Sequence, residues 1–134
     1  MALAILALAG CAGFYSPAPD AITASLNVKS VPTPWICVDG KRQLLSKDTS
    51  GYAPIPAGGR VTVGSSFYNY VYQGVSTSCS ARSSLVPVPG QKYYLDFEIE
   101  AERCTALVFK EDPSSRTGLA LESTLRPSSE CSYR

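Results

Sequence analysis

The sequence contains no histidine, and this absence removes several kinds of chemistry at once. Histidine is the commonest general base and the commonest metal ligand, so a serine or cysteine nucleophile activated by histidine is excluded. No S-x-x-K motif replaces it, and the glycine pair at 58–59 precedes an expected strand rather than a phosphate-binding helix. We therefore expect no catalytic residue, no metal, no cofactor and no enzymatic activity.

The chain also lacks an excess of charge of either sign and any long apolar run. Twelve Lys and Arg against eleven Asp and Glu give a net charge of +1, whereas nucleic-acid-binding domains usually carry a basic excess. A hydrophobic fraction of 45 % argues against a disordered chain. A membrane-spanning helix needs about 20 apolar residues, and no such run occurs. We expect neither nucleic acid nor nucleotide as a partner, and 134 residues suit one domain.

What the sequence does contain begins with an uncharged apolar segment, residues 2–10, followed by Cys11. Its length fits the apolar region of a secretory signal peptide, and a short buried helix is the alternative. Leu8-Ala9-Gly10-Cys11 matches an apolar-small-small-Cys lipobox at all four places, and in this the chain resembles the bacterial lipoproteins. The resemblance implies cleavage before Cys11 and acyl chains on that residue, which together anchor a protein firmly. The first charged residue is Asp20, so we expect the basic start of the signal to be truncated.

The same resemblance implies a location and a domain plan. Ala12 rather than Asp follows the cysteine, which implies a lipid anchor in the bacterial outer membrane, and we expect the periplasmic face. Residues 1–10 are then the signal peptide, residues 11–21 are the lipidated cysteine and a flexible, proline-containing tether, and residues 22–134 are one domain.

Four cysteines remain after Cys11 is assigned to lipidation: Cys37, Cys79, Cys104 and Cys131. An even number in an exported chain predicts two disulfides, whereas a zinc site is disfavoured because no C-x-x-C pair occurs. If Cys79 and Cys104 lay two strands apart in one flat sheet, their Cα atoms would be about 9–10 Å apart, beyond the limit of about 7 Å for a disulfide. A twist or a change of sheet would remove that objection, so the pairing stays open.

Strand patterns fill the domain, and no helical period of ten or more residues follows residue 10. Apolar and polar residues alternate over 22–28, 60–72 and 93–100, with shorter strand candidates at 79–88, 104–109 and 119–121. Asp39-Gly40 predicts the type I′ turn of a hairpin, and Gly64 with its serine neighbours predicts a bulge or a bend. Six to eight short strands predict an all-β fold, a small antiparallel β-sandwich or alternatively a small barrel, held by two disulfides.

The segment from Trp35 to Asp112 resembles, more loosely, small envelope lipoproteins of unknown function. The likeness lies in Cys37 to Lys41, in Ile55 to Gly58, and in the Pro89-Gly90 turn with the aromatic strand to Phe97. These motifs are mostly turn chemistry, so the resemblance implies a fold and not an activity.

Two stripes of side chains are candidate functional surfaces. Tyr68, Tyr70 and Tyr72 share one face of a strand and could form a platform for sugar or peptide, although a strand face covered by the second sheet explains them as well. Asp96, Glu98 and Glu100 are spaced about 6.5–7 Å apart along one face, as in inverting glycosidases or a Ca²⁺ site. We interpret this acidic stripe as a solvated outer face.

The sequence therefore predicts an envelope lipoprotein that acts without catalysis. We expect a binding or scaffolding module whose partner is an envelope protein or the cell-wall polymer. The alternative is a periplasmic inhibitor of a hydrolase such as lysozyme, in which an exposed loop plugs a foreign active site.

Overall fold

The computed structural model of the chain describes residues 13–71, 75–100 and 103–132. It is an all-β structure of nine strands in two sheets that do not close into a barrel, so the prediction of a sandwich is confirmed with one more strand than the upper limit expected. The part of the chain that is described contains no helix able to span a bilayer. Cys11 and residues 1–10 lie outside the described residues.

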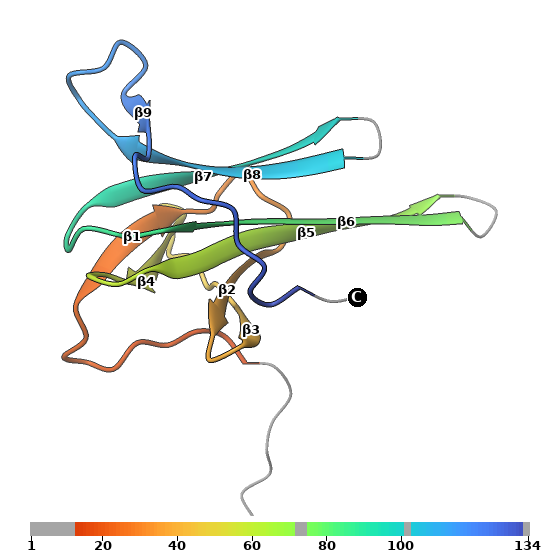
Figure 1. Cartoon of the computed structure of the whole chain (residues 1–134), viewed down its shortest axis with the longest axis horizontal. Coiled ribbons are helices and arrows are strands. Elements are labelled where there is room, and N and C mark those ends of the chain that lie inside the picture. The colour runs from red at the N-terminus through yellow and green to blue at the C-terminus, as the bar shows by residue number, and fades with distance from the viewer. Residues whose placement is uncertain (1–12, 72–74, 101–102, 133–134) are drawn as a thin grey trace, which may run out of the picture.

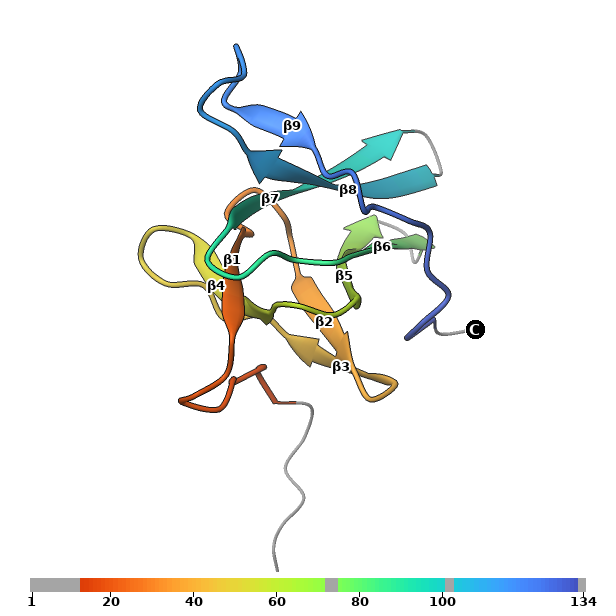
Figure 2. The same cartoon turned by 60° about the vertical axis from the view of Figure 1, so that its left-hand side comes forward.

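The two sheets are arranged as two layers (Figures 1 and 2). The five-stranded sheet has the order β4-β1-β7-β8-β9, with bounds Tyr52–Pro56, Thr23–Asn27, Lys92–Glu100, Arg103–Glu111 and Leu119–Leu121. The four-stranded sheet has the order β3-β2-β5-β6, with bounds Lys41–Leu44, Pro34–Val38, Val61–Val71 and Val75–Leu85. Every pair is antiparallel except β1 with β7. The long hairpins β5–β6 and β7–β8 extend in the same direction, past the shorter strands (Figure 1).

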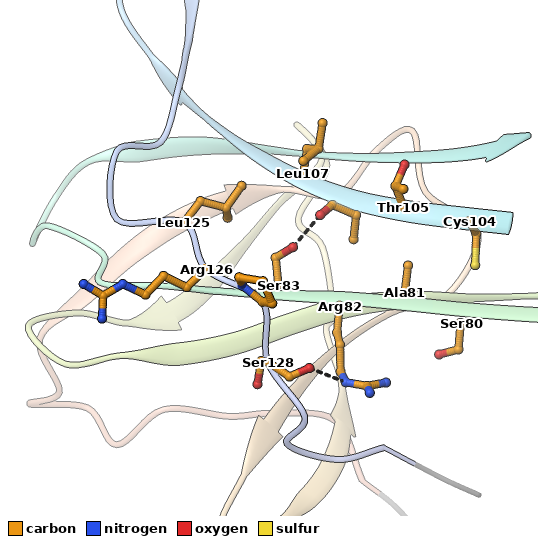
Figure 3. Close-up of a pocket in the computed structure, with 12 residues that line it drawn as sticks. Ser80, Ala81, Arg82, Ser83, Cys104, Thr105, Leu107, Leu125, Arg126 and Ser128 are labelled. Atoms are coloured by element: carbon orange, nitrogen blue, oxygen red, sulfur yellow. Dashed lines mark hydrogen bonds between the residues drawn. The ribbon is translucent and has the colours of Figure 1, made fainter.

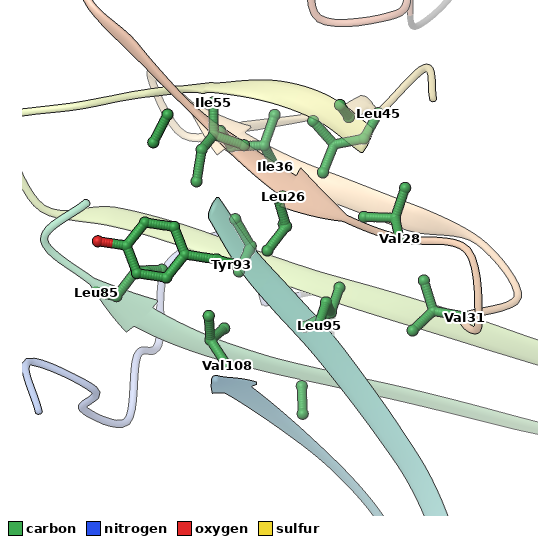
Figure 4. Packing of buried hydrophobic residues seen from close by; sticks show 14 of the residues in the cluster. Leu26, Val28, Val31, Ile36, Leu45, Ile55, Leu85, Tyr93, Leu95 and Val108 are labelled. Carbon is green, nitrogen blue, oxygen red and sulfur yellow. The ribbon is translucent and has the colours of Figure 1, made fainter. Parts of the chain in front are cut away.

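The core lies between the sheets because alternate residues of each strand point inward. Tyr93 and Leu95 of β7 are fully buried, and they face residues of β1, β4, β5 and β6 (Figure 4). The leucines and isoleucines of this cluster are Leu26, Ile36, Leu45, Ile55, Leu85 and Leu95. The phenol oxygen of Tyr93 accepts a hydrogen bond of 2.9 Å from the Val88 N–H, so this buried polar atom has a partner.

The hairpin predicted at Asp39-Gly40 is confirmed. Asp39 and Gly40 have φ angles of 52° and 76°, which is the left-handed pair that a type I′ turn requires. β2 and β3 pair on either side of this turn, with Val38 opposite Lys41. Turn chemistry alone thus determined this register.

The bulge predicted at Gly64 is wrong. β5 and β6 pair continuously over eleven positions, and Gly64 lies opposite Arg82 without an extra residue on either strand. The glycine is required instead by Trp35 on the neighbouring strand β2, because a Cβ at position 64 would lie 2.5 Å from ring atom Cζ2 of Trp35. A large ring on one strand therefore demands the smallest residue opposite it.

Strand β4 was not expected from the sequence because it contains Pro54 and Pro56. Proline cannot donate to a strand ladder and is confined to edges. β4 is the outermost strand of its sheet and pairs only with β1. The edge position explains how a proline-rich segment forms a strand.

The two predicted disulfides are present, and they are Cys37–Cys131 and Cys79–Cys104. Cys79 is on β6 and Cys104 is on β8, so this bond joins the two sheets, with a Cα–Cα distance of 6.1 Å. Because the two cysteines lie on different sheets, the separation of about 9–10 Å expected for two strands of one flat sheet does not apply. Cys131 fastens the C-terminal segment to β2, with a Cα–Cα distance of 5.9 Å.

Part of the expected tether lies against the domain. Tyr15 donates its N–H to the Leu44 carbonyl at 2.8 Å, and the Leu44 N–H donates to the Gly13 carbonyl at 3.3 Å. Tyr15 also packs against the core cluster. Gly13 to Tyr15 thus cover the free edge of β3.

Candidate ligand-binding face

The outer face of the four-stranded sheet carries the candidate site. On β5, Val63 and Ser65 point into the sandwich, so Ser66 and Tyr68 share the opposite, outer face. The register places Ser78 opposite Tyr68 and Ser80 opposite Ser66. We call the surface formed by Arg42, Ser66, Tyr68, Ser78, Ser80 and Arg82 the tyrosine face.

Trp35 forms the floor beside this face. Its ring is 1 % exposed although it lies outside the main core cluster. The indole Nε1 donates to Ser66 Oγ at 3.2 Å, and the Arg42 guanidinium carbon lies 4.1 Å from the ring centroid. A buried ring stacked under a cation fixes the position of Arg42. Trp35 is thus a packing residue on the outer side of the sheet.

Serine hydroxyls continue the hydrogen-bond network across the face. Ser66 Oγ accepts a bond of 3.3 Å from Arg42 Nη1 and lies 3.0 Å from Ser80 Oγ. Because Ser66 is 6 % exposed, the network is held in place by packing. The arrangement is therefore organised before any ligand arrives.

These residues surround a cavity of about 320 Å³ on the outer face, lined by Arg42, Ser66, Tyr68, Ser78, Cys79, Ser80 and Arg82. The Tyr68 side chain is 71 % exposed, so most of its ring is open to solvent. Two guanidinium groups, serine hydroxyls and one exposed aromatic ring are thus gathered at one place. Among the described residues, none that line this cavity carries a carboxylate.

The C-terminal segment orients both arginines. Arg42 Nε donates to the Cys131 carbonyl at 3.0 Å, and Arg82 Nε donates to the Ser128 carbonyl at 2.9 Å. These acceptors are neutral, and no carboxylate among residues 13–71, 75–100 and 103–132 forms an ion pair with Arg82. The positive charge of Arg82 is therefore available to an anionic ligand.

The predicted tyrosine stripe is described only in part. Tyr68 stands on the uncovered outer face, so the second sheet does not bury it. The backbone of Tyr70 pairs with Ser76 in the same hairpin, but its side chain, and Tyr72 altogether, lie outside what the structure describes. The grouping of Arg42, Arg82, Ser78 and Ser80 was missed, because only the pairing of β3, β2, β5 and β6 brings these residues to Tyr68.

The acidic stripe lies on the outer face of the other sheet. Asp96 is half-buried and Glu98 and Glu100 are exposed. Leu95, just before Asp96, is fully buried, whereas Ile99, between the two glutamates, is 46 % exposed. Glu100 lies opposite Arg103 across the β7–β8 pair. No group of three His, Cys, Asp or Glu side chains in the described residues is arranged to hold a metal ion. The exposure of Glu98 and Glu100 agrees with the interpretation as a solvated face.

A second hollow, the edge groove, was not foreseen from the sequence. It has a volume of about 430 Å³ and lies between β6, β8 and the segment from Leu125 to Ser128 (Figure 3). Ser83 Oγ donates to the Ala106 carbonyl at 2.5 Å across its base. Residues from three distant parts of the chain form this groove, which is why no local motif marked it.

No protein-family model, curated protein or solved structure matches this chain.

Proposed function

We propose that the protein is a non-catalytic binding module of the bacterial cell envelope, lipid-anchored through Cys11 at the periplasmic face of the outer membrane. Its tyrosine face holds a ligand of the envelope, and the cell-wall polymer is the ligand class that fits best. The observation that carries the proposal is the exposed ring of Tyr68 beside a cavity walled by Arg42, Arg82 and serine hydroxyls.

The chemistry of this face matches a polymer of sugars that bear carboxylates. An exposed phenol ring offers a large, stiff contact area for an apolar sugar face at low entropic cost. The hydroxyls of Ser78 and Ser80 can hydrogen-bond sugar hydroxyls, and guanidinium groups bind carboxylates with two parallel hydrogen bonds. An envelope protein with an acidic surface is the second partner class that these groups could recognise.

The rigidity of the face supports binding rather than turnover. Arg42 is held by the Trp35 ring, by Ser66 and by the Cys131 carbonyl. Fixing such groups in advance lowers the entropy cost of association. General acid–base catalysis needs a proton-transfer group of suitable pKa, and the lining offers only arginine, serine, tyrosine, disulfide-bonded cysteine and no carboxylate.

The test is co-sedimentation of the full chain, in mild detergent, with purified peptidoglycan. We expect the unmodified chain to sediment with the polymer and Tyr68→Ala to lose most of this binding. Tyr94→Ala is the matched control, because Tyr94 is also a strand tyrosine but lies on the other sheet, bonded to Ser30. Equal retention of both variants, or no sedimentation of the unmodified chain, would contradict the proposal for this face.

The inhibitor alternative is tested separately by a lysozyme turbidity assay. The proposal expects unchanged lysis at micromolar concentrations of the protein. Inhibition that survives Tyr68→Ala would favour the alternative function.

The anchor is tested by mass spectrometry of the protein recovered from bacterial membranes. The proposal expects a chain that begins at Cys11 and carries an acyl adduct on that residue. A chain that retains residues 1–10 and remains in the soluble fraction would contradict the assigned location.

A further inference from the structure

The sandwich has four free sheet edges, and three of them are protected. Exposed strand edges invite pairing with other chains, and proteins block them with proline, lysine, short strands or a covering segment. β4 contains two prolines and β9 has only three residues. β3 has four residues, begins at Lys41 and is covered by Gly13 to Tyr15.

The fourth edge, β6, is covered only near its C-terminal end, where the segment 124–128 bonds to Ser84 and Val86. It is eleven residues long and contains neither proline nor lysine. Its pairing with β5 is continuous, without a protective bulge. The open edge of β6 is therefore the exception in a fold that otherwise protects its edges.

One position of this edge is already occupied, and it shows how the edge pairs. The N–H of Ser84 donates to the Arg126 carbonyl at 2.8 Å, and the N–H of Arg126 donates to the Ser84 carbonyl at 2.9 Å. This is an antiparallel bridge. After it the C-terminal segment leaves the edge for the outer face, where Cys131 is bonded to Cys37. A strand thus adds to β6 in antiparallel orientation and stops after a single position.

The next positions along β6 are open. Backbone groups of alternate residues point to the same side of a strand, so Arg82 and Ser80 direct their N–H and C=O groups to the side on which Ser84 meets Arg126. Within the described part of the chain, no backbone group bonds to the N–H of Ser80 or Arg82. These unpaired groups border the edge groove between β6 and β8 (Figure 3).

The lining of the groove indicates the chemistry of the occupant. It contains Arg82 and Arg126 and no acidic residue, while Thr105 and Leu107 of β8 form the opposite wall. A strand paired with Arg82 would place its facing side chain on the same face as that guanidinium. An acidic side chain fits this position, whereas a second copy of β6 would bring a second Arg82 to an edge that already has two arginines.

We infer that the open edge of β6 binds an extended, acidic peptide segment of a partner protein, which adds to the four-stranded sheet as an antiparallel strand in the edge groove. The backbone bonds to Ser80 and Arg82 give the affinity, and the contact of a carboxylate with Arg82 selects the peptide. This inference does not depend on the polymer-binding proposal, because it concerns the backbone edge rather than the Tyr68 ring.

The test uses the full chain in mild detergent and the capped peptide Thr-Thr-Val-Glu-Val-Thr-Thr as a probe, with a Glu-to-Lys version as its control. We expect the acidic peptide to slow amide hydrogen exchange at Ser80 and Arg82. The lysine peptide should bind about tenfold more weakly, as expected when an attractive charge contact becomes repulsive.

Two variants at position 80 distinguish the contribution of the backbone N–H to peptide binding from that of the side chain. Ser80→Pro removes an outward N–H without removing a bond to β5, whereas Ser80→Ala keeps this N–H. Both lose the contact with Ser66, so a difference between them reports on the backbone rather than on the hydroxyl. We expect binding of the acidic peptide to be about tenfold weaker for the proline variant than for the alanine variant.

The outcomes distinguish this inference from its rivals. No binding of the acidic peptide, equal binding of the two peptides, or equal binding by both variants would overturn it. Exchange protection that depends on protein concentration without peptide would indicate a second copy as the occupant and would also overturn it. If Ser80→Pro fails to fold, exchange at Ser80 and Arg82 in the unmodified chain still decides the question. Loss of polymer binding in Tyr68→Ala leaves all these outcomes unchanged.

Discussion

Trp35 lies directly against Gly64 across the β2–β5 pair, with no room for a side chain between the two residues. The same ring lies beneath Arg42 and bonds to Ser66. This packing contact therefore connects the interior of the sheet to the proposed ligand-binding face.

Replacing Gly64 by alanine should destabilise the fold. The added Cβ would meet Trp35 at 2.5 Å and would collide with the Ala81 carbonyl oxygen, and overpacking of this kind costs about 1–3 kcal/mol. Gly59→Ala is the control, because a Cβ there meets nothing within 4 Å and no positive φ is required. Urea unfolding of the two variants should show a clear loss for the first and almost none for the second.

The two disulfides should contribute unequally to stability. Cys37 and Cys131 are 94 residues apart, whereas Cys79 and Cys104 are 25 apart. The chain-entropy model assigns about 4–5 kcal/mol to the longer loop and about 3–4 kcal/mol to the shorter one. Thermal unfolding of the paired serine variants should follow that order, and peptide mapping should recover only these two pairings. Recovery of Cys37 joined to Cys79 would contradict the topology.

Stability should fall in alkaline solution because of Tyr52. The hydrogen bond between its phenol and Glu111 is the main cause that raises the pKa of Tyr52 above 10.0. Because the pKa of Tyr52 is higher in the folded than in the unfolded state, its contribution to the free energy of unfolding is complete below pH 10.0. That contribution is lost as the pH rises through the pKa of the folded state. Unfolding measured across this range should show a weaker pH dependence for Tyr52→Phe. In Tyr94→Phe, which removes only the bond to Ser30, the dependence should persist.

The loop carboxylates should titrate at unusually low pH. The Ser50 hydroxyl is the main cause that lowers the pKa of Asp48 below 3.8, and the Ser114 hydroxyl acts in the same way on Asp112. Stability from these contacts is therefore present above that pH and is lost as the pH falls through the lower folded values. In an NMR titration, Ser50→Ala should raise the pKa of Asp48 and leave that of Asp112 unchanged. A shift at both sites would indicate that the loops are coupled.

Local sequence chemistry was sufficient for the strands that follow simple rules. Alternation predicted β7 almost to its ends, and Asp39-Gly40 predicted the β2–β3 turn, because both signals depend only on neighbouring residues. β4 was missed because its prolines are compatible with a strand only at an edge. Which strand lies at an edge is not encoded locally.

The candidate site likewise depended partly on local sequence and partly on the strand order. Tyr68 was a candidate from its own strand, but Arg42 and Arg82 join it only through the pairing of β3, β2, β5 and β6. The glycine at 64 was interpreted as a bulge because Trp35, its true cause, is 29 positions away in the sequence.

The sequence by itself determined that the protein is all-β and that four cysteines form two bonds. These properties follow from alternation, turn residues and cysteine number. Only the tertiary structure decided which cysteines pair, which edges are open and which charges meet Tyr68. Those properties depend on how two sheets stack and in what order their strands lie, because burial between sheets brings together residues that are far apart in the chain.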